Sequence, residues 1–251
     1  MRKVALLAIC AVILSLSSCD EFFSNSLGTF RTYDPAKIDV NAGNINDWIR
    51  ASIGNQKLAQ AVSEAILRKL ANLPPGSPER AALLAGGIRI AIESSGISES
   101  ILSRCAELLG KGDDITQDTV QDLLAKIQGD FNSNGGPQAA DKIAQMVGES
   151  ISGNPPQFDP AYADNVEAGD VAQAIMILVL GQLGDSTTDN WDDLNFLDSG
   201  LSSDGQHISY GGEDPNVKAL AAYLNLISGN PEKFGDNSLT GSISDALINK
   251  K

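Results

Sequence analysis

The residues best suited to chemistry in this sequence are acidic side chains that gather in one segment. The densest group is Asp185, Asp189, Asp192 and Asp193. Calcium takes about six to eight oxygen ligands, so these carboxylates are a candidate metal site. Their spacing does not match an EF-hand loop, because no alternating run of aspartates leads to a glycine and a closing glutamate. A solvated acidic loop explains the same residues and is the favoured interpretation.

Catalytic motifs are not visible in the sequence. His207 is the only histidine, so a Ser-His-Asp arrangement would depend on one residue in a predicted loop. The sequence contains no Gly-x-Ser-x-Gly elbow and no glycine-rich phosphate loop that ends in Gly-Lys-Ser or Gly-Lys-Thr. We therefore expect a protein that is not an enzyme and that has no cofactor.

Acylation of a thiol is the chemistry indicated at Cys19. Residues 1–18 begin with two basic residues after Met1, continue with an apolar run over 4–14 and end in Leu-Ser-Ser directly before the cysteine. This pattern is typical of an export signal. The Leu-Ser-Ser-Cys tetrapeptide resembles the lipobox of bacterial lipoproteins. The resemblance implies that the thiol receives a diacylglycerol, that the chain is cut before the cysteine, and that the new amine is often acylated.

Two alternatives for residues 1–18 are an ordinary signal peptide with an incidental cysteine and a transmembrane anchor. An apolar run over 4–14 is shorter than the roughly 20 residues that cross a bilayer, which disfavours the anchor. Two or three acyl chains make attachment to a membrane persistent. We therefore expect the domain to be held on a membrane without spanning it.

The residues after the cysteine carry a second, short resemblance. Cys-Asp-Glu-Phe-Phe-Ser at 19–24, followed by Leu27-Gly28, Arg31 and Asp34-Pro35, is similar to the mature start of some uncharacterised spirochaetal lipoproteins. In enterobacterial lipoproteins an aspartate directly after the cysteine implies retention in the inner membrane. Asp20 fits that pattern, but spirochaetes need not follow it. The expected location is thus a bacterial membrane, facing the periplasm, with inner or outer membrane left open.

The composition indicates a folded, acidic body. Hydrophobic residues make up 42% of the chain. Of 18 basic residues two lie within 1–18, so the remainder carries 16 against 32 acidic residues, a net charge of −16. Such a charge repels phosphate backbones and anionic lipid headgroups, so nucleic acid is not an expected partner. We interpret the acidity as spread along the helices, where it serves solubility.

The cysteines do not predict a disulfide or a zinc site. Cys10 is expected to be removed with the signal and Cys19 to carry the lipid. Cys105 is then the one free cysteine of the mature chain. It falls on an apolar helical stripe, which favours a buried hydrophobic role. With His207 as the only histidine, the usual zinc ligand sets cannot be assembled.

Residues 19–43 have no clear periodicity and are predicted to be a lipidated tether before a single helical domain over 44–251. Aromatic residues are concentrated there: Phe22, Phe23, Phe30 and Tyr33. They lie either in the membrane interface or against the domain. The second alternative is favoured, because Asp20 and Glu21 would be repelled by anionic headgroups.

Apolar residues recur at helical spacing over 44–251, which predicts an all-α fold of about eight to ten helices in an irregular bundle or helical-pair array. One helix ends before Pro74-Pro75, and Ser77 caps the next, which runs to about Ser95 and is largely buried. Gly86-Gly87 costs helix propensity in the middle of that helix. The pair therefore predicts a close crossing with another helix.

Further helices are predicted from their start signals and apolar faces. Helix starts are expected after Ile97, after Ile115, at Pro137 and at Pro215, and a short helix is expected around 243–248. The charge-free segment 171–183 is too short to cross a membrane and is predicted to be the central helix.

A short motif occurs twice, as Ile-Ser-Gly-Asn-Pro followed by Phe at 151–158 and at 227–234. A helix stop used twice explains the Gly-Asn-Pro. A duplicated pair of helical hairpins is the alternative, and it would also explain the matched phenylalanine.

The longest non-periodic segment, 185–213, is predicted to be a long acidic loop that contains Trp191, Phe196 and Tyr210. These aromatics are candidate partner-binding residues, or they hold the loop on its own core. We expect a lipid-anchored, non-catalytic interaction or scaffold module that presents a helical surface or this loop to an envelope protein. The alternative is a binding protein for a small or lipidic ligand in a cavity between Ala- and Gly-rich helices.

Overall fold

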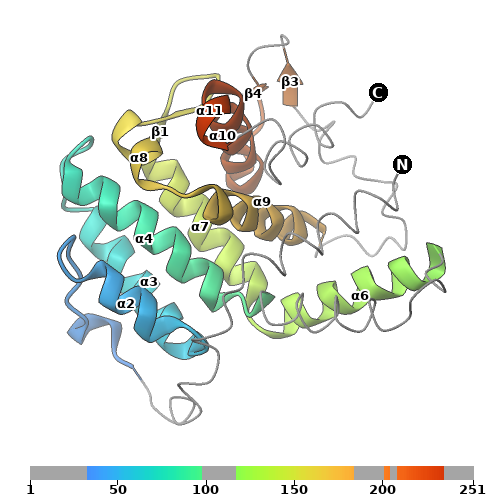
Figure 1. The fold of residues 1–251 in the computed structure, drawn as a ribbon, viewed down its shortest axis with the longest axis horizontal. Coiled ribbons are helices and arrows are strands. Elements are labelled where there is room, and N and C mark those ends of the chain that lie inside the picture. The colour runs from blue at the N-terminus through green and yellow to red at the C-terminus, as the bar shows by residue number, and fades with distance from the viewer. Residues whose placement is uncertain (1–32, 98–116, 184–200, 204–207, 235–251) are drawn as a thin grey trace.

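Helices make up most of the structure, a computed structural model that describes residues 33–97, 117–183, 201–203 and 208–234. The α-helices in these residues are α2 (Ile45–Ser52), α3 (Gln56–Leu70), α4 (Pro78–Ser94), α6 (Gln117–Ser133), α7 (Gly136–Ser150), α8 (Pro160–Asn165), α9 (Ala168–Leu183), α10 (Pro215–Gly229) and α11 (Pro231–Phe234). A 3₁₀ turn, η2 (Pro35–Lys37), precedes them. The predicted all-α class is confirmed (Figure 1).

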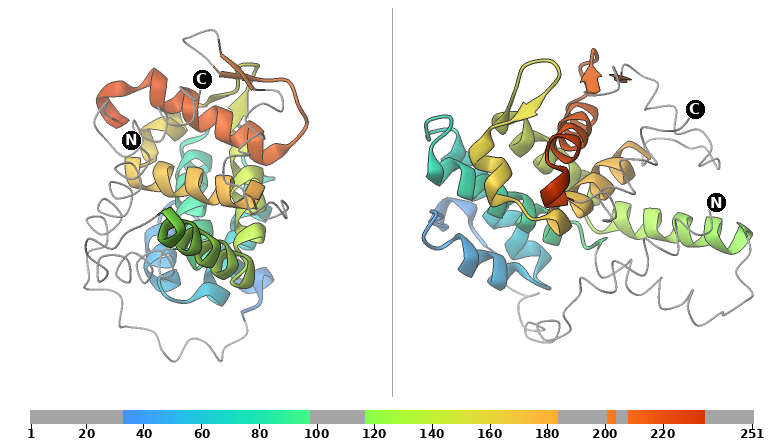
Figure 2. Two further views of the ribbon diagram at one scale, coloured as in Figure 1. Left: turned by 90° about the vertical axis from the view of Figure 1, so that its right-hand side faces the viewer. Right: turned by 45° about the horizontal axis from the view of Figure 1, so that its top comes forward.

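The helices form successive layers from the N-terminal to the C-terminal part of the chain. Helices α2 and α3 lie at the lower left of Figure 1, α10 and α11 lie at the top with α4 and α7 between them, and α6 extends to the right; the left view of Figure 2 also shows α2 and α3 below α10. Helix α4 contacts α2, α3, α7, α8 and α9, and α7 contacts α3, α6, α9 and α10. The middle of the fold is therefore shared by α4 and α7.

The prediction of a buried helix in segment 171–183 is confirmed. Helix α9 buries residues such as Val171, Ile175 and Leu178 to within 1% exposure. It packs on α7, α10, α4 and α6. The high hydropathy of this segment thus identified a helix that its neighbours cover.

Helix boundaries follow local signals in the sequence. Ser77 Oγ accepts a hydrogen bond from Arg80 N at 3.3 Å, with Pro78 in the first turn. Asp214 Oδ1 caps α10 by accepting from Asn216 N at 2.8 Å. These two predicted starts, and the stop of α3 at Leu70, are confirmed.

The predicted close crossing occurs on both sides of α4. A Cβ atom added to Gly86 would lie 2.2 Å from Cγ1 of Ile45 on α2. One added to Gly87 would lie 2.9 Å from Sδ of Met146 on α7. Neither distance is possible between carbon side chains, so the two glycines allow α2 and α7 to approach α4 from different sides.

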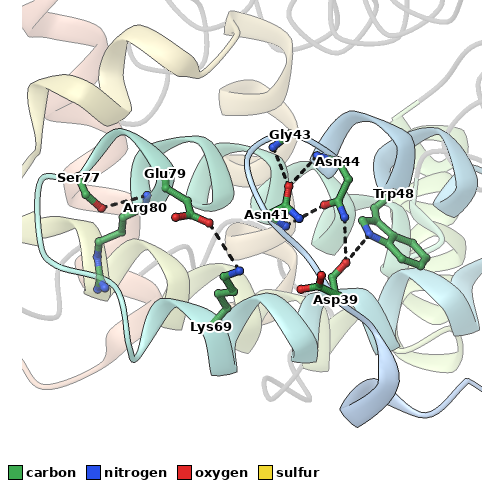
Figure 3. A network of polar contacts seen from close by, with 9 residues as sticks. All are labelled: Asp39, Asn41, Gly43, Asn44, Trp48, Lys69, Ser77, Glu79 and Arg80. Carbon is green, nitrogen blue, oxygen red and sulfur yellow. Dashed lines mark hydrogen bonds and ion pairs between the residues drawn. The ribbon is translucent and has the colours of Figure 1, made fainter.

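A buried cation joins the ends of three helices near this crossing. Arg80 is 6% exposed, and its Nη1 donates to the carbonyls of Leu70 and Leu73, the latter at 2.9 Å. Its Nη2 lies 2.5 Å from Glu149 Oε2 on α7. Next to it, Lys69 and Glu79 pair at 3.6 Å between α3 and α4 (Figure 3). Arg80 thus satisfies carbonyls that the end of α3 leaves unpaired.

Two antiparallel hairpins were not predicted. Strands β1 (Ile151–Ser152) and β2 (Gln157–Phe158) pair, and so do β3 (Leu201–Ser203) and β4 (Ile208–Tyr210). The second hairpin lies within the segment predicted as a long loop. Its register places Leu201 opposite Tyr210 and Ser203 opposite Ile208.

The repeated motif has two different structures. Its first copy forms the β1–β2 hairpin, whereas the second copy ends α10 and continues into α11, where Phe234 is fully buried. The structural finding therefore favours a helix stop used twice over a duplicated hairpin. The predicted helix after Ile97, Cys105 and the predicted helix at 243–248 lie outside the described residues.

Substitution Gly86→Ala is expected to destabilise the protein by about 1–3 kcal/mol, because the new methyl group overpacks against Ile45. Gly148→Ala is the matched control, since this α7 glycine is exposed and has no atom within 4 Å of an added Cβ. The control is expected to gain roughly 0.5–1 kcal/mol of helix propensity. Urea unfolding followed by circular dichroism measures both, and equal effects would contradict the crossing.

Candidate functional site

The segment between the predicted tether and α2 is fixed by a network of asparagines (Figure 3). Asn41 Oδ1 accepts from Gly43 N at 2.9 Å, and Asn44 Oδ1 accepts from Asn41 N at 2.8 Å. Asn44 Nδ2 and Trp48 Nε1 both donate to the carbonyl of Asp39, at 3.0 and 3.1 Å. The backbone at Asp39 is therefore held on α2.

The chain is held further upstream by contacts with α3. Asn55 Nδ2 donates to the Tyr33 hydroxyl at 3.1 Å, and the Arg68 guanidinium donates to the carbonyl of Pro35. Val40 is only 2% exposed. The folded part therefore begins before the boundary expected at Asn44. For Tyr33 the structure agrees with packing on the domain, while Phe22, Phe23 and Phe30 lie outside the described residues.

A shallow hollow of ≈ 360 Å³ lies between η2 and α3. It is lined by Asp34, Pro35, Ala36, Glu64, Leu67 and Arg68. Its three charged side chains already have partners: Asp34 pairs with Lys37 at 3.8 Å, Glu64 with Lys142 at 3.4 Å, and Arg68 binds the Pro35 carbonyl. Of these contacts, the bond from Arg68 to the Pro35 carbonyl holds η2 on α3.

The small residues expected to leave room for a ligand serve close packing instead. Besides the two glycines of α4, a Cβ added to Gly181 on α9 would lie 2.8 Å from the Cβ of Ala140 on α7. Small residues at such crossings let backbones approach and fill the space between helices. They give no support to a ligand cavity at these positions.

A polar cluster lies where α4 meets the start of α9. Arg89 Nε lies 3.5 Å from Asp170 Oδ1, and Glu93 follows Arg89 by one turn of α4. Burial raises the pKa of Glu93 to about 7, although Arg89 opposes the shift. Burial also raises the pKa of Asp170 to about 6, with Arg89 again opposing and Glu167 adding to it.

An aromatic pair adjoins this cluster. The hydroxyls of Tyr162 on α8 and Tyr223 on α10 lie 3.2 Å apart, and both rings are fully buried. The Phe158 ring stacks on Tyr162 at 4.5 Å. Burial raises the pKa of both phenols, and the charge of Asp170 raises them further, so both phenols are neutral at physiological pH. The group joins α8, α9 and α10 through neutral and weakly ionised side chains.

Perturbed carboxyl groups are found at active sites and also in structural ion-pair networks. Here the cation Arg89 is 44% exposed and pairs with Asp170 across the helix interface. The residues are packed between helices and do not border the hollow at η2. The structure therefore describes these carboxyl groups as partners of Arg89 within a helix interface.

Most of the site residues predicted from sequence lie outside the described residues. These are Cys19, Trp191, Phe196, Asp185, Asp189, Asp192 and Asp193. The described exception is Tyr210 on β4, which is 9% exposed and accepts a hydrogen bond from Asp214 N at 3.0 Å. This burial favours the alternative in which Tyr210 holds its segment on the core.

Asn225 has a structural role that sequence reasoning missed. It is 7% exposed within the apolar run of α10. Its Oδ1 accepts from Ile208 N at 2.7 Å, and its Nδ2 donates to the carbonyls of Ile208 and Pro156, at 2.8 and 3.1 Å. One amide thus fixes both hairpins on α10. A lone asparagine inside an apolar helix was the available signal.

The acidic residues are spread along the helices but are not divided equally between the two parts of the chain. Residues 19–97 carry eight basic and eight acidic residues, whereas residues 98–251 carry eight basic and 24 acidic ones. The entire net charge of −16 therefore belongs to the later part of the chain. Counting charge in successive windows of the sequence would have found it.

The structure shows where the charged residues of these two parts of the chain lie. We call the exposed charged side chains of residues 33–70 the tether face. They are Asp34, Lys37, Asp39, Asp47, Arg50, Lys57, Glu64 and Arg68. We call the described residues from 117 onward the acidic half, which has 12 acidic and four basic residues. The tether face includes both helices at one end of the fold, and α10 and α11 of the acidic half lie at the other (Figure 2).

Comparison with protein-family models, with curated proteins and with solved structures gave no match to this chain. Within the described residues, no group of three or more His, Cys, Asp or Glu side chains could hold a metal ion. The helices described by the structure include none that is long and apolar enough to cross a membrane. The two surfaces are therefore the features on which a function is argued.

The Glu93 carboxyl group predicts a pH-dependent stability. Its pKa rises from 4.5 to about 7 on folding, so the folded state keeps a proton that the unfolded state releases between these values. The contribution of this group falls as pH rises through that window. Glu93→Gln is therefore expected to raise the free energy of unfolding at pH 8 by on the order of 1–3 kcal/mol and to change it little at pH 4.

Denaturant unfolding at both pH values measures this difference. Glu232→Gln on α11 is the matched control, because Glu232 is exposed. The control is expected to behave like the parent protein at both pH values. A Glu93→Gln variant with the same stability change at pH 4 and pH 8 would show that the carboxyl group is not held protonated in the fold.

Proposed function

We propose that this chain is a lipid-anchored interaction module of the bacterial envelope, which binds a basic protein partner through its acidic half. Its attachment is through a lipid on Cys19, and its folded body faces the periplasm. The observation that carries the proposal is the segregation of charge, with a net charge of zero over 19–97 and −16 over 98–251. No catalytic step is part of the proposal.

Charge segregation supports binding because solubility alone does not require it. A soluble surface needs net charge and no large apolar patch, and an even distribution provides both. A body that is acidic on one side creates a directional field, which speeds encounter with a cationic surface and excludes anionic ones. A basic protein surface is thus the partner that fits the acidic half.

The lipid anchor is supported by the order of the signal, the lipobox resemblance and the chain that follows. Thirteen residues, 20–32, separate Cys19 from the first described residue, Tyr33. A chain of that length reaches at most about 50 Å. The folded body would therefore remain within about one domain diameter of the membrane that holds the lipid.

Replacement of the anchor residue is expected to abolish lipid labelling. Cells that express the protein are grown with a radioactive fatty acid, and the immunoprecipitated protein is examined for label. Cys19→Ala is expected to lose the label and to migrate at the mass of the uncleaved chain, because lipidation precedes cleavage. Cys105→Ala is the matched control and should retain both label and cleavage. Equal labelling of Cys19→Ala and the parent would refute the anchor.

Partner binding is tested by crosslinking in intact cells. A photo-crosslinking residue is placed at Gln157, an exposed position on β2 in the acidic half. We expect an adduct with a basic protein, and we expect the pair Asp164→Lys and Glu167→Lys to reduce the adduct at least fivefold. Both replaced side chains are exposed acids near α8.

The control for this experiment makes the same change of charge on the tether face. Asp34→Lys with Glu64→Lys alters two exposed acids of η2 and α3 and should leave the adduct unchanged. If both double variants reduce the adduct equally, total charge and not the acidic half governs binding. If no adduct forms at Gln157, the proposed partner surface is wrong.

A further inference from the structure

The point at which the tether joins the fold lies at the end of the molecule formed by α2 and α3. The Tyr33 hydroxyl is bound by Asn55, and the Pro35 carbonyl is bound by Arg68 on α3. The Asp39 carbonyl is bound by Asn44 and by Trp48 on α2 (Figure 3). The chain that leads to Cys19 therefore leaves the fold from this end.

The position of the anchor residue alone does not specify which face of the body meets the lipid. The distribution of charge favours one orientation of the folded body on the membrane. The tether face has four basic and four acidic exposed side chains, whereas the acidic half has 12 acidic and four basic residues. Anionic headgroups repel the acidic half, and screening limits this repulsion to about 8–10 Å at ordinary ionic strength. The repulsion is smallest when the tether face is the nearer side.

Ion pairs within the tether face reduce its net field. Three of the four acids on the tether face are aspartates, and two of them already pair with a base: Asp34 with Lys37 at 3.8 Å and Asp47 with Arg50 at 3.9 Å. The paired charges of this face largely cancel one another, so anionic headgroups meet less repulsion over it than over the acidic half.

We infer that the tether face lies against the anionic phosphate headgroups of the membrane that holds Cys19, with the acidic half turned away from the lipid. This inference rests on the lipid anchor of the proposed function. It names the lipid surface as the partner of one end of the fold and leaves the opposite end exposed for the basic protein.

The experiment uses the full lipidated protein, purified and reconstituted into vesicles of phosphatidylcholine with phosphatidylglycerol. A fluorescent label is attached at Asn46→Cys on α2 or at Gln157→Cys on β2, each in a Cys105→Ser background. Both positions are neutral, polar and exposed in the parent. Quenching by a lipid with a nitroxide on its headgroup is expected to be at least threefold stronger for the α2 label.

Two further changes test whether charge causes this orientation: one alters the lipid composition of the vesicles and the other alters the charge of the protein. The difference in quenching is expected to fall at least twofold in vesicles of pure phosphatidylcholine. The pair Lys37→Glu and Arg50→Glu should reduce it similarly in anionic vesicles. Lys126→Glu with Lys218→Glu is the matched control, because it makes the same change of charge on exposed residues of the acidic half. This control should preserve the difference.

The outcomes separate the inference from the anchor. If the labelled proteins float with vesicles in a Cys19-dependent manner but the two labels are quenched equally, the orientation is refuted and the anchor stands. Stronger quenching of the Gln157→Cys label refutes the orientation as well. A difference that persists in neutral vesicles refutes the role of charge. If the protein does not float, the proposed anchor fails and the inference fails with it.

Discussion

The close approach of three helices at Gly86 and Gly87 is the constraint on which the rest of the fold depends. Any side chain at these positions would occupy the space of Ile45 on α2 or Met146 on α7. Two adjacent glycines cost α4 helix propensity. The cost is offset by burial, because α4 then contacts both the end layer and the C-terminal layers. This crossing therefore gives α2 and α3 most of their contact with the rest of the chain, through α4.

The parts of the fold that could be predicted are those with local causes. Ser77 and Asp214 cap helices through atoms two or three residues away, so their signals are complete in the sequence. The hairpins could not be predicted in this way. Their short strands are fixed on α10 by Asn225, whose partners Pro156 and Ile208 lie 69 and 17 residues away.

The site shows the same division between local and distant causes. Arg89 and Glu93 are one turn apart on α4, so their proximity was visible from spacing. The raised pKa of Glu93 was not visible from spacing, because it depends on the burial of Glu93 and on the position of Asp170 on α9. The resemblance of residues 16–19 to a lipobox and the aromatic residues near 185–213 could be recognised from residue types alone. The burial of Tyr210 depends on its position in β4, which no local pattern indicated.

Average composition gave a misleading account of the surface because electrostatic interactions in salt are short-ranged. A net charge of −16 suggests repulsion from every anionic surface. However, charges more than about 10 Å apart are largely screened at 0.1 M salt, so an approaching membrane meets only the charges of the nearest face. The tether face is balanced in charge, and the excess acid belongs to the other half. One domain can therefore tolerate an anionic lipid surface at one end and attract a cationic protein at the other. The order of charges along the chain determines this property, and the total does not.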